Sequence, residues 1–175
     1  MEIIIRQEKE NDYKITESVV EEAFKSPEYN PNEHLLVANL RKSNVFIPEL
    51  SLIAEVDGKI VGHIMLTKLI IKNKEKEHES LALAPLSVLP LYQNKGIGSA
   101  LINESLRIAK DLGYKSVIVL GHEKYYPKFG FKPASTWGIK SPFDVPDDVF
   151  MALELERGSL NGVTGTVIYS KEFFD

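Results

Sequence analysis

The stretch LSVLPLYQNKGIGSALI, residues 86–102, decides the fold that we expect for this chain. It begins with an apolar strand end and continues through a polar, glycine-containing turn into a helix. The helix is predicted from Ile97 to Leu112, with Gly113 placed to end it. Its apolar residues share one stripe, as expected of a helix that packs on a sheet. They are Ile97, Leu101, Ile108, Ala109 and Leu112.

The segments around this stretch predict a mixed sheet. Ser116–Leu120 is a short β-branched run, typical of a buried parallel strand, so strand, helix and strand form a βαβ unit that we expect to be right-handed. Asp57-Gly58 predicts a hairpin turn between two apolar strands. The other expected elements are a strand at Glu2–Arg6, helices after Asp12 and Pro31, strands at Ser51–Val56, Lys59–Leu66 and Leu81–Leu89, and a closing C-terminal hairpin of Val149–Leu155 with Thr164–Ser170. The expected class is α/β (α+β), a mostly antiparallel central sheet flanked by helices.

Composition narrows the functional classes. The chain has 175 residues, of which 43% are hydrophobic, so a single domain over residues 1–175 is expected. It has no cysteine, which excludes a catalytic thiolate and a Cys-ligated zinc site, and its histidines lack metal-ligand spacing, so no metal is expected. A net charge of −4 argues against a general nucleic-acid binder. Without a signal peptide or a long apolar run, we expect a cytoplasmic protein without membrane association.

The turn Gln93–Ser99 carries the functional signal. Backbone N–H groups at the start of a helix have no intrahelical partner, and the helix dipole adds roughly half a positive charge there. Gly96 and Gly98 have no Cβ and let a phosphate approach the backbone, while Lys95 adds a full positive charge. The turn therefore predicts a site for a phosphate-bearing ligand.

Two common nucleotide motifs do not match this turn. The Gly-x-x-x-x-Gly-Lys-Ser/Thr pattern of a P-loop is missing, and no third glycine follows near Ile102 as a dinucleotide fingerprint requires. The residues favour a different phosphate-bearing cofactor. An ordinary tight turn and a nucleotide-binding regulator remain the alternatives.

These residues resemble the acetyl-CoA motif of the GNAT superfamily of N-acetyltransferases, in which Gln/Arg-x-x-Gly-x-Gly/Ala follows a Val-x-Pro strand end. Gln93, Gly96 and Gly98 occupy the motif positions. The later sequence GHEKYYPKFGFKPA, residues 121–134, is similar to the second signature of the family, where a tyrosine, here Tyr126, lies four residues before Gly-Phe. The Leu-Gly-His exit from the fifth strand is typical of the YhbS-like branch. The resemblance covers essentially the whole chain.

The resemblance implies a GNAT-type fold in which strands four and five splay apart around acetyl-CoA. Pro85, a proline within a central strand, independently predicts a bulge that helps to part these strands and leaves backbone groups for the pantetheine arm. The cofactor-binding residues that we expect are Leu86, Ser87, Val88, Gln93, Asn94, Lys95, Gly96, Ile97, Gly98, Ser99 and Tyr126.

The implied activity is direct transfer of an acetyl group from acetyl-CoA to a primary amine in a ternary complex. The Val88 N–H is expected to polarise the acetyl carbonyl, and Tyr126 to share a proton with the departing thiolate. The alternative for Tyr126 is a packing aromatic. His122 is a candidate general base because its ordinary pKa of about 6.5 suits neutral pH, and the alternative is a loop hydrogen bond.

The acceptor is an unidentified amine on a small molecule or a protein. We expect it to be selected by the segments near Glu21–Pro48 and Trp137–Asp148. A homodimer is compatible with the sequence, and a non-catalytic acyl-CoA-binding or sensing module is the functional alternative. Further candidate bases are the carboxylates Glu22, Glu49, Glu55, Glu123 and Asp148.

Overall fold

The computed structural model describes residues 1–28 and 31–175, so residues 29 and 30 of the expected acceptor-selecting segment lie outside the described residues. The helices are α1 (Tyr13–Phe24), α2 (Glu33–Arg41) and α3 (Ile97–Asp111). The strands are β1 (Ile4–Gln7), β2 (Ser51–Val56), β3 (Lys59–Lys72), β4 (Glu77–Val88), β5 (Ser116–Leu120), β6 (Lys132–Pro133), β7 (Ile139–Lys140), β8 (Phe150–Glu154) and β9 (Gly165–Ile168).

The chain divides into two compact units, and β3 and β4 each contribute residues to both. Unit 1 comprises Met1–Thr67, Ala84–Ile108 and Glu172–Asp175. Unit 2 comprises Lys68–Leu83 and Ala109–Lys171. A single domain over the whole chain stays a prediction.

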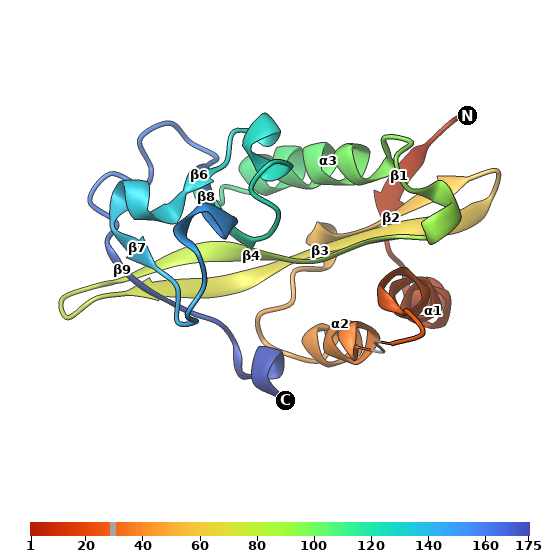
Figure 1. Cartoon of the computed structure of the whole chain (residues 1–175), viewed down its shortest axis with the longest axis horizontal. Coiled ribbons are helices and arrows are strands. Elements are labelled where there is room, and N and C mark those ends of the chain that lie inside the picture. Colours follow the sequence, from red (N-terminus) through yellow and green to blue (C-terminus); the bar gives the residue numbers. More distant parts are fainter. Residues whose placement is uncertain (29–30) are drawn as a thin grey trace. The chain divides into compact units, whose positions relative to one another are not determined.

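Unit 1 is a sheet covered by helices. Its strands follow the order β1-β2-β3-β4, and β1 pairs antiparallel with β2, and β2 with β3. Asp57 and Gly58 both have positive φ, 51° and 76°, which confirms the tight turn predicted between β2 and β3. Figure 1 shows α1 and α2 on one face of these strands and the start of α3 on the other.

The helix faces are buried in part as their periodicity predicts, whereas Ile15 of α1 and Leu35 of α2, which share the predicted apolar patterns, are exposed. Val20 of α1 and Val37 and Leu40 of α2 form a fully buried cluster with Met65 of β3. On the other face, a Cβ added to Gly62 of β3 would lie 3.1–3.2 Å from side-chain atoms of Leu101 and Ile97. The absence of a side chain at Gly62 therefore lets the first turns of α3 lie directly on β3. Leu112, predicted on the apolar stripe, is instead exposed beyond the end of α3.

Unit 2 contains two parallel strand pairs, β4 with β5 and β7 with β9. Leu81 and Ala82 of β4 pair in parallel with Val117 and Ile118 of β5, as the βαβ prediction requires, and this pairing ends before Pro85. The Ala84–Pro85 peptide bond is cis, and the bulge at Pro85 stays a prediction. Antiparallel pairs predominate in the sheet, so the predicted fold class is confirmed.

The predicted closing hairpin is wrong. β8 pairs with β5 and β6, whereas β9 pairs with β3 and β7. The free edge that receives β9 exists because β3 runs past Leu66 to Lys72, where Ile70, Ile71 and Lys72 pair with β9. The charged segment Lys72–Glu79, predicted as a loop, thus contains strand ends on both sides of a short turn.

Candidate functional site

The turn before α3 is open at the end of the helix. Asn94 and Gly96 have φ values of 62° and 85°, and the helical hydrogen bonds begin with the Ala100 N–H, which donates to the Gly96 carbonyl at 3.0 Å. The N–H groups of the first turn therefore have no intrahelical acceptor. A Cβ on Gly96 would meet no atom within 4 Å, so the backbone conformation requires glycine there and the space above it is open. This arrangement can bind an anion.

Gln93 braces the turn against the end of β4. Its side-chain amide donates to the Val88 carbonyl at 3.1 Å, and Leu89, the first residue after the strand, donates its N–H to the Val61 carbonyl at 2.8 Å. The Gln93 side chain thus holds the strand end in place. Whether any part of Gln93 binds a cofactor stays a prediction.

Leu86, Ser87 and Val88 lie beside the start of α3. The Ser87 carbonyl oxygen is 3.1 Å from the position of a Cβ on Gly62, the residue on which Ile97 and Leu101 also pack. Strand end, turn and helix start therefore form one continuous feature of unit 1. All of the expected cofactor-binding residues except Tyr126 belong to it: Leu86, Ser87, Val88, Gln93, Asn94, Lys95, Gly96, Ile97, Gly98 and Ser99.

Tyr126 lies in unit 2, in a short turn after β5, and its ring is packed among aromatic residues. Its ring centroid is 5.6 Å from that of Phe131 and 5.2 Å from that of Tyr125, both in edge-on geometry. Burial, reinforced by Tyr125, raises the pKa of Tyr126 to about 12. Its hydroxyl therefore stays protonated at neutral pH and can donate a hydrogen bond. The packing is visible in the structure, while the role as proton donor stays a prediction.

His122 is exposed and makes the loop hydrogen bond that was the alternative to a base. Its Nδ1 accepts the backbone N–H of Lys124 at 3.1 Å. An imidazole that accepts at Nδ1 carries its proton on Nε2, so in this conformation it has no free lone pair for a substrate proton. A base role for His122 requires the loop bond to break.

A buried polar network in unit 1 was not predicted. The Arg41 guanidinium, whose side chain is 5% exposed, donates to the Glu8 carboxylate through Nη2 at 2.7 Å and Nε at 3.2 Å, and to Glu17 through Nη1 at 2.8 Å. The Ser51 hydroxyl donates to Glu8 at 2.8 Å, and it lies 3.0 Å from His63 Nε2. Because the one hydroxyl proton is used on Glu8, Ser51 accepts from the Nε2–H of His63.

This network lowers the pKa values of two titratable groups. The pKa of His63 is lowered to about 4, mainly by burial; the nearby Glu8 carboxylate opposes this shift and the Arg41 charge adds to it. Burial opposes ionisation of Glu8. Attraction to the His63 ring in its protonated form, together with the hydrogen bonds and charge of Arg41, outweighs burial, so the pKa of Glu8 lies below its ordinary value. Glu8 is charged and His63 neutral at neutral pH. The Glu8 and His63 side chains are buried in unit 1, so we expect the network to have a structural role.

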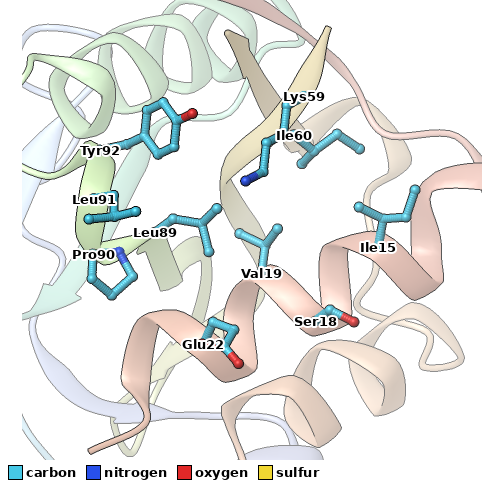
Figure 2. Close-up of a pocket in the computed structure, with 10 residues that line it drawn as sticks. All are labelled: Ile15, Ser18, Val19, Glu22, Lys59, Ile60, Leu89, Pro90, Leu91 and Tyr92. Atoms are coloured by element: carbon cyan, nitrogen blue, oxygen red, sulfur yellow. The ribbon is translucent and has the colours of Figure 1, made fainter. Parts of the chain in front are cut away.

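A groove of about 560 Å³ lies in unit 1 between α1, the start of β3 and residues 89–92 (Figure 2). Leu91, which is 85% exposed, forms part of its wall. Glu22, predicted only as one of several candidate bases, and Lys59, not singled out by the sequence, both line it. The signal that could have found the groove is the apolar run Leu89–Tyr92 directly before the turn.

The described residues were also compared with the requirements of a metal site and of a membrane-spanning helix. Across residues 1–28 and 31–175, no three His, Asp or Glu side chains are grouped to hold a metal ion. In the same residues, no helix is both long and apolar enough to span a membrane. Of the other candidate bases, Glu55 is paired with Arg6 at 2.8 Å.

Comparison with known proteins agrees with the sequence resemblance. Residues 14–131 match the profile described as the Acetyltransferase (GNAT) family. The chain is 40% identical over 114 residues to the uncharacterized N-acetyltransferase YjhQ of Escherichia coli K12, a match that covers 65% of this chain and 63% of YjhQ.

Two solved structures share the fold over nearly the full chain. The structure of YhbS from Escherichia coli, a complex with CoA, has a TM-score of 0.88 and 27% identity, and covers 99% of this chain and 92% of YhbS. An acetyltransferase from Brucella melitensis in complex with acetyl-CoA has a TM-score of 0.79 and 32% identity, and covers 98% of both chains. The likeness to the YhbS-like branch is confirmed.

Proposed function

We propose that this chain, which belongs to the Acetyltransferase (GNAT) family, transfers the acetyl group of acetyl-CoA to a primary amine. The observation that carries the proposal is the open first turn of α3, braced by Gln93 against the end of β4. Such a turn suits the pyrophosphate of CoA. The complexes of the YhbS and Brucella melitensis proteins with CoA and acetyl-CoA support the choice of ligand.

The proposed reaction needs no covalent enzyme intermediate. The acceptor ammonium first loses a proton to a base, and the neutral nitrogen attacks the carbonyl carbon of the thioester. The C–N bond forms, the C–S bond breaks, the nitrogen loses a second proton and the CoA sulfur gains one. We assign the Val88 N–H to the carbonyl oxygen, where negative charge develops.

We assign Tyr126 to the departing sulfur. The pKa of Tyr126 is about 12, whereas that of a thiol is about 8.5, so complete proton transfer from Tyr126 to the thiolate is unfavourable. Its role is therefore a hydrogen bond that stabilises the thiolate while the proton arrives, which predicts a modest contribution to turnover.

The test is calorimetric titration of the purified protein with acetyl-CoA, CoA, ATP and NAD, followed by an assay of free thiol release with amines and peptides. We expect CoA and acetyl-CoA to bind more tightly than ATP or NAD, and thiol release to depend on an added amine. Tighter binding of ATP or NAD would contradict the proposal in favour of a nucleotide-binding regulator. Acetyl-CoA binding without transfer to any amine would identify a non-catalytic sensing module.

A further inference from the structure

We propose that the groove beside α1 binds the acceptor, and that the acceptor is a free amino acid with an apolar side chain, held through its carboxylate by Lys59. This inference rests on the proposed acetyl transfer and names its substrate class. The groove lies wholly within unit 1.

The walls of the groove are apolar and open to water. Ile15 of α1 is 53% exposed and Leu91 is 85% exposed, which is unusual for large apolar side chains that face a common space. A ligand with an apolar body would remove this surface from water. The volume of about 560 Å³ lies in the range of small-molecule sites. The lining residues are Ile15, Ser18, Val19, Glu22, Lys59, Ile60, Leu89, Pro90, Leu91 and Tyr92.

Lys59 brings a positive charge to the groove and forms no ion pair with any carboxylate in the part of the chain that the structure describes. Figure 2 shows its side-chain nitrogen directed into the space beside Tyr92 and Leu89. The nitrogen lies 5.8 Å from the centre of the Tyr92 ring. An ammonium beside apolar walls attracts a carboxylate more strongly than one in bulk water. The groove therefore favours a ligand that combines an apolar body with a carboxylate.

Glu22 lies at the edge of the same groove, on α1. Its negative charge favours a ligand that also carries an ammonium, which is the form in which an amine substrate arrives. Leu89, another lining residue, directly follows Val88. A ligand in the groove thus lies next to the strand end assigned to the thioester. Apolar body, carboxylate and ammonium together describe an apolar amino acid.

The experiment compares L-phenylalanine with 2-phenylethylamine, which has the same apolar body and amine without the carboxylate. Calorimetric titration of the CoA-saturated protein is expected to show binding of L-phenylalanine at least ten-fold tighter than that of the amine. Lys59→Met, which keeps the apolar stem at an exposed position, is expected to abolish this difference. Leu91→Ser is expected to weaken both ligands alike. Lys14→Met, at an exposed position of α1 outside the groove, is the matched control and should keep the preference.

The outcomes separate the two proposals. Equal affinity for the two probes, or a preference that survives in Lys59→Met, overturns the groove assignment. If L-phenylalanine fails to bind while another amine is acetylated, the groove assignment falls and the acetyltransferase proposal stands. If L-phenylalanine binds through Lys59 but neither it nor any other amine is acetylated, the acetyltransferase proposal falls and the acceptor role of the groove falls with it.

Discussion

The Glu8–Arg41–His63 network and the Gln93–Ser99 turn both lie in unit 1, but they differ in how far their polar groups are hydrogen-bonded within the protein. In the network, a guanidinium, a carboxylate and a hydroxyl satisfy one another in the protein interior. In the turn, the backbone donors at the start of α3 have no intrahelical acceptor and the space above Gly96 is open. The paired groups of the network are expected to stabilise the fold, whereas the backbone donors of the turn face open space and can bind a ligand.

Substitutions in the two regions should therefore separate stability from binding. Changes in the network should lower the free energy of unfolding and leave cofactor affinity in the folded protein unaltered. Changes in the turn should do the reverse, apart from any cost of the backbone conformation itself.

Arg41→Met tests the network most severely, because it leaves the buried Glu8 carboxylate without its cation. We expect the free energy of unfolding to fall by about 3–5 kcal/mol, as measured by urea denaturation at pH 7. Arg107→Met is the control, since Arg107 pairs with Glu104 on the exposed side of α3 and should change stability by less than about 1 kcal/mol. A loss for Arg41→Met as small as that of the control would show that the network is not structural.

The pH dependence of stability should also originate in the network. His63 has a folded pKa of about 4, below the ordinary value of about 6.5, so the unfolded chain takes up the proton first as the pH falls. Its contribution is complete above pH 6.5 and is lost progressively between about 6.5 and 4, by about 3 kcal/mol in total. The lowered pKa of Glu8 acts in the same direction at more acidic pH.

Urea denaturation at several pH values measures this slope. His63→Gln should flatten it between pH 6.5 and 4, whereas the exposed His122→Gln should leave it unchanged. An unaltered slope in His63→Gln would assign the pH dependence to other groups.

Gly96→Ala and Gly113→Ala compare the two ends of α3. Both glycines have positive φ, 85° and 92°, and a Cβ at either would meet no atom within 4 Å, so each substitution should cost a similar backbone strain of about 1–2 kcal/mol. Only Gly96 lies in the turn, so only Gly96→Ala should weaken acetyl-CoA binding in calorimetry, by about ten-fold. Equal affinities in the two variants would remove the turn from the binding site.

Tyr126→Phe tests whether the Tyr126 hydroxyl stabilises the fold, like the network, or interacts with the ligand, as proposed for the turn. If it serves the ligand, turnover should fall by about ten-fold, the value of one hydrogen bond in the transition state, with stability and acetyl-CoA affinity unchanged. Steady-state kinetics with an active amine measures this effect, and Tyr125→Phe is the control. A loss of stability without loss of turnover would place the hydroxyl in the structure instead.

Local signals in the sequence predicted much of the fold. β2 and β5 have the predicted bounds, and α1 begins directly after Asp12, because β-branched runs, helical periodicity and glycine turns are all encoded within a few residues. The pairing of β9 with β3 was not predicted, since it joins Ile70 to Ile168 across the chain. Which strand occupies a free edge depends on non-local contacts that periodicity does not contain.

The same division applies to the candidate site. The turn at Gly96 was predicted because its chemistry depends on consecutive residues. The network was missed because Glu8, Arg41 and His63 are far apart in sequence, and each alone is an ordinary polar residue. The groove was missed for a similar reason, since Lys59 and Leu91 acquire significance only when they line the same space.

Gly62 limits the distance between the end of β4 and the start of α3. The Ser87 carbonyl from one side and the Ile97 and Leu101 side chains from the other come within van der Waals contact of the place where its Cβ would be. Because Gly62 has no side chain, the end of β4 and the start of α3 can both pack closely against it. A larger residue there would increase the distance between the Gln93–Ser99 turn and Val88, and a cofactor that reaches both would then need a longer arm.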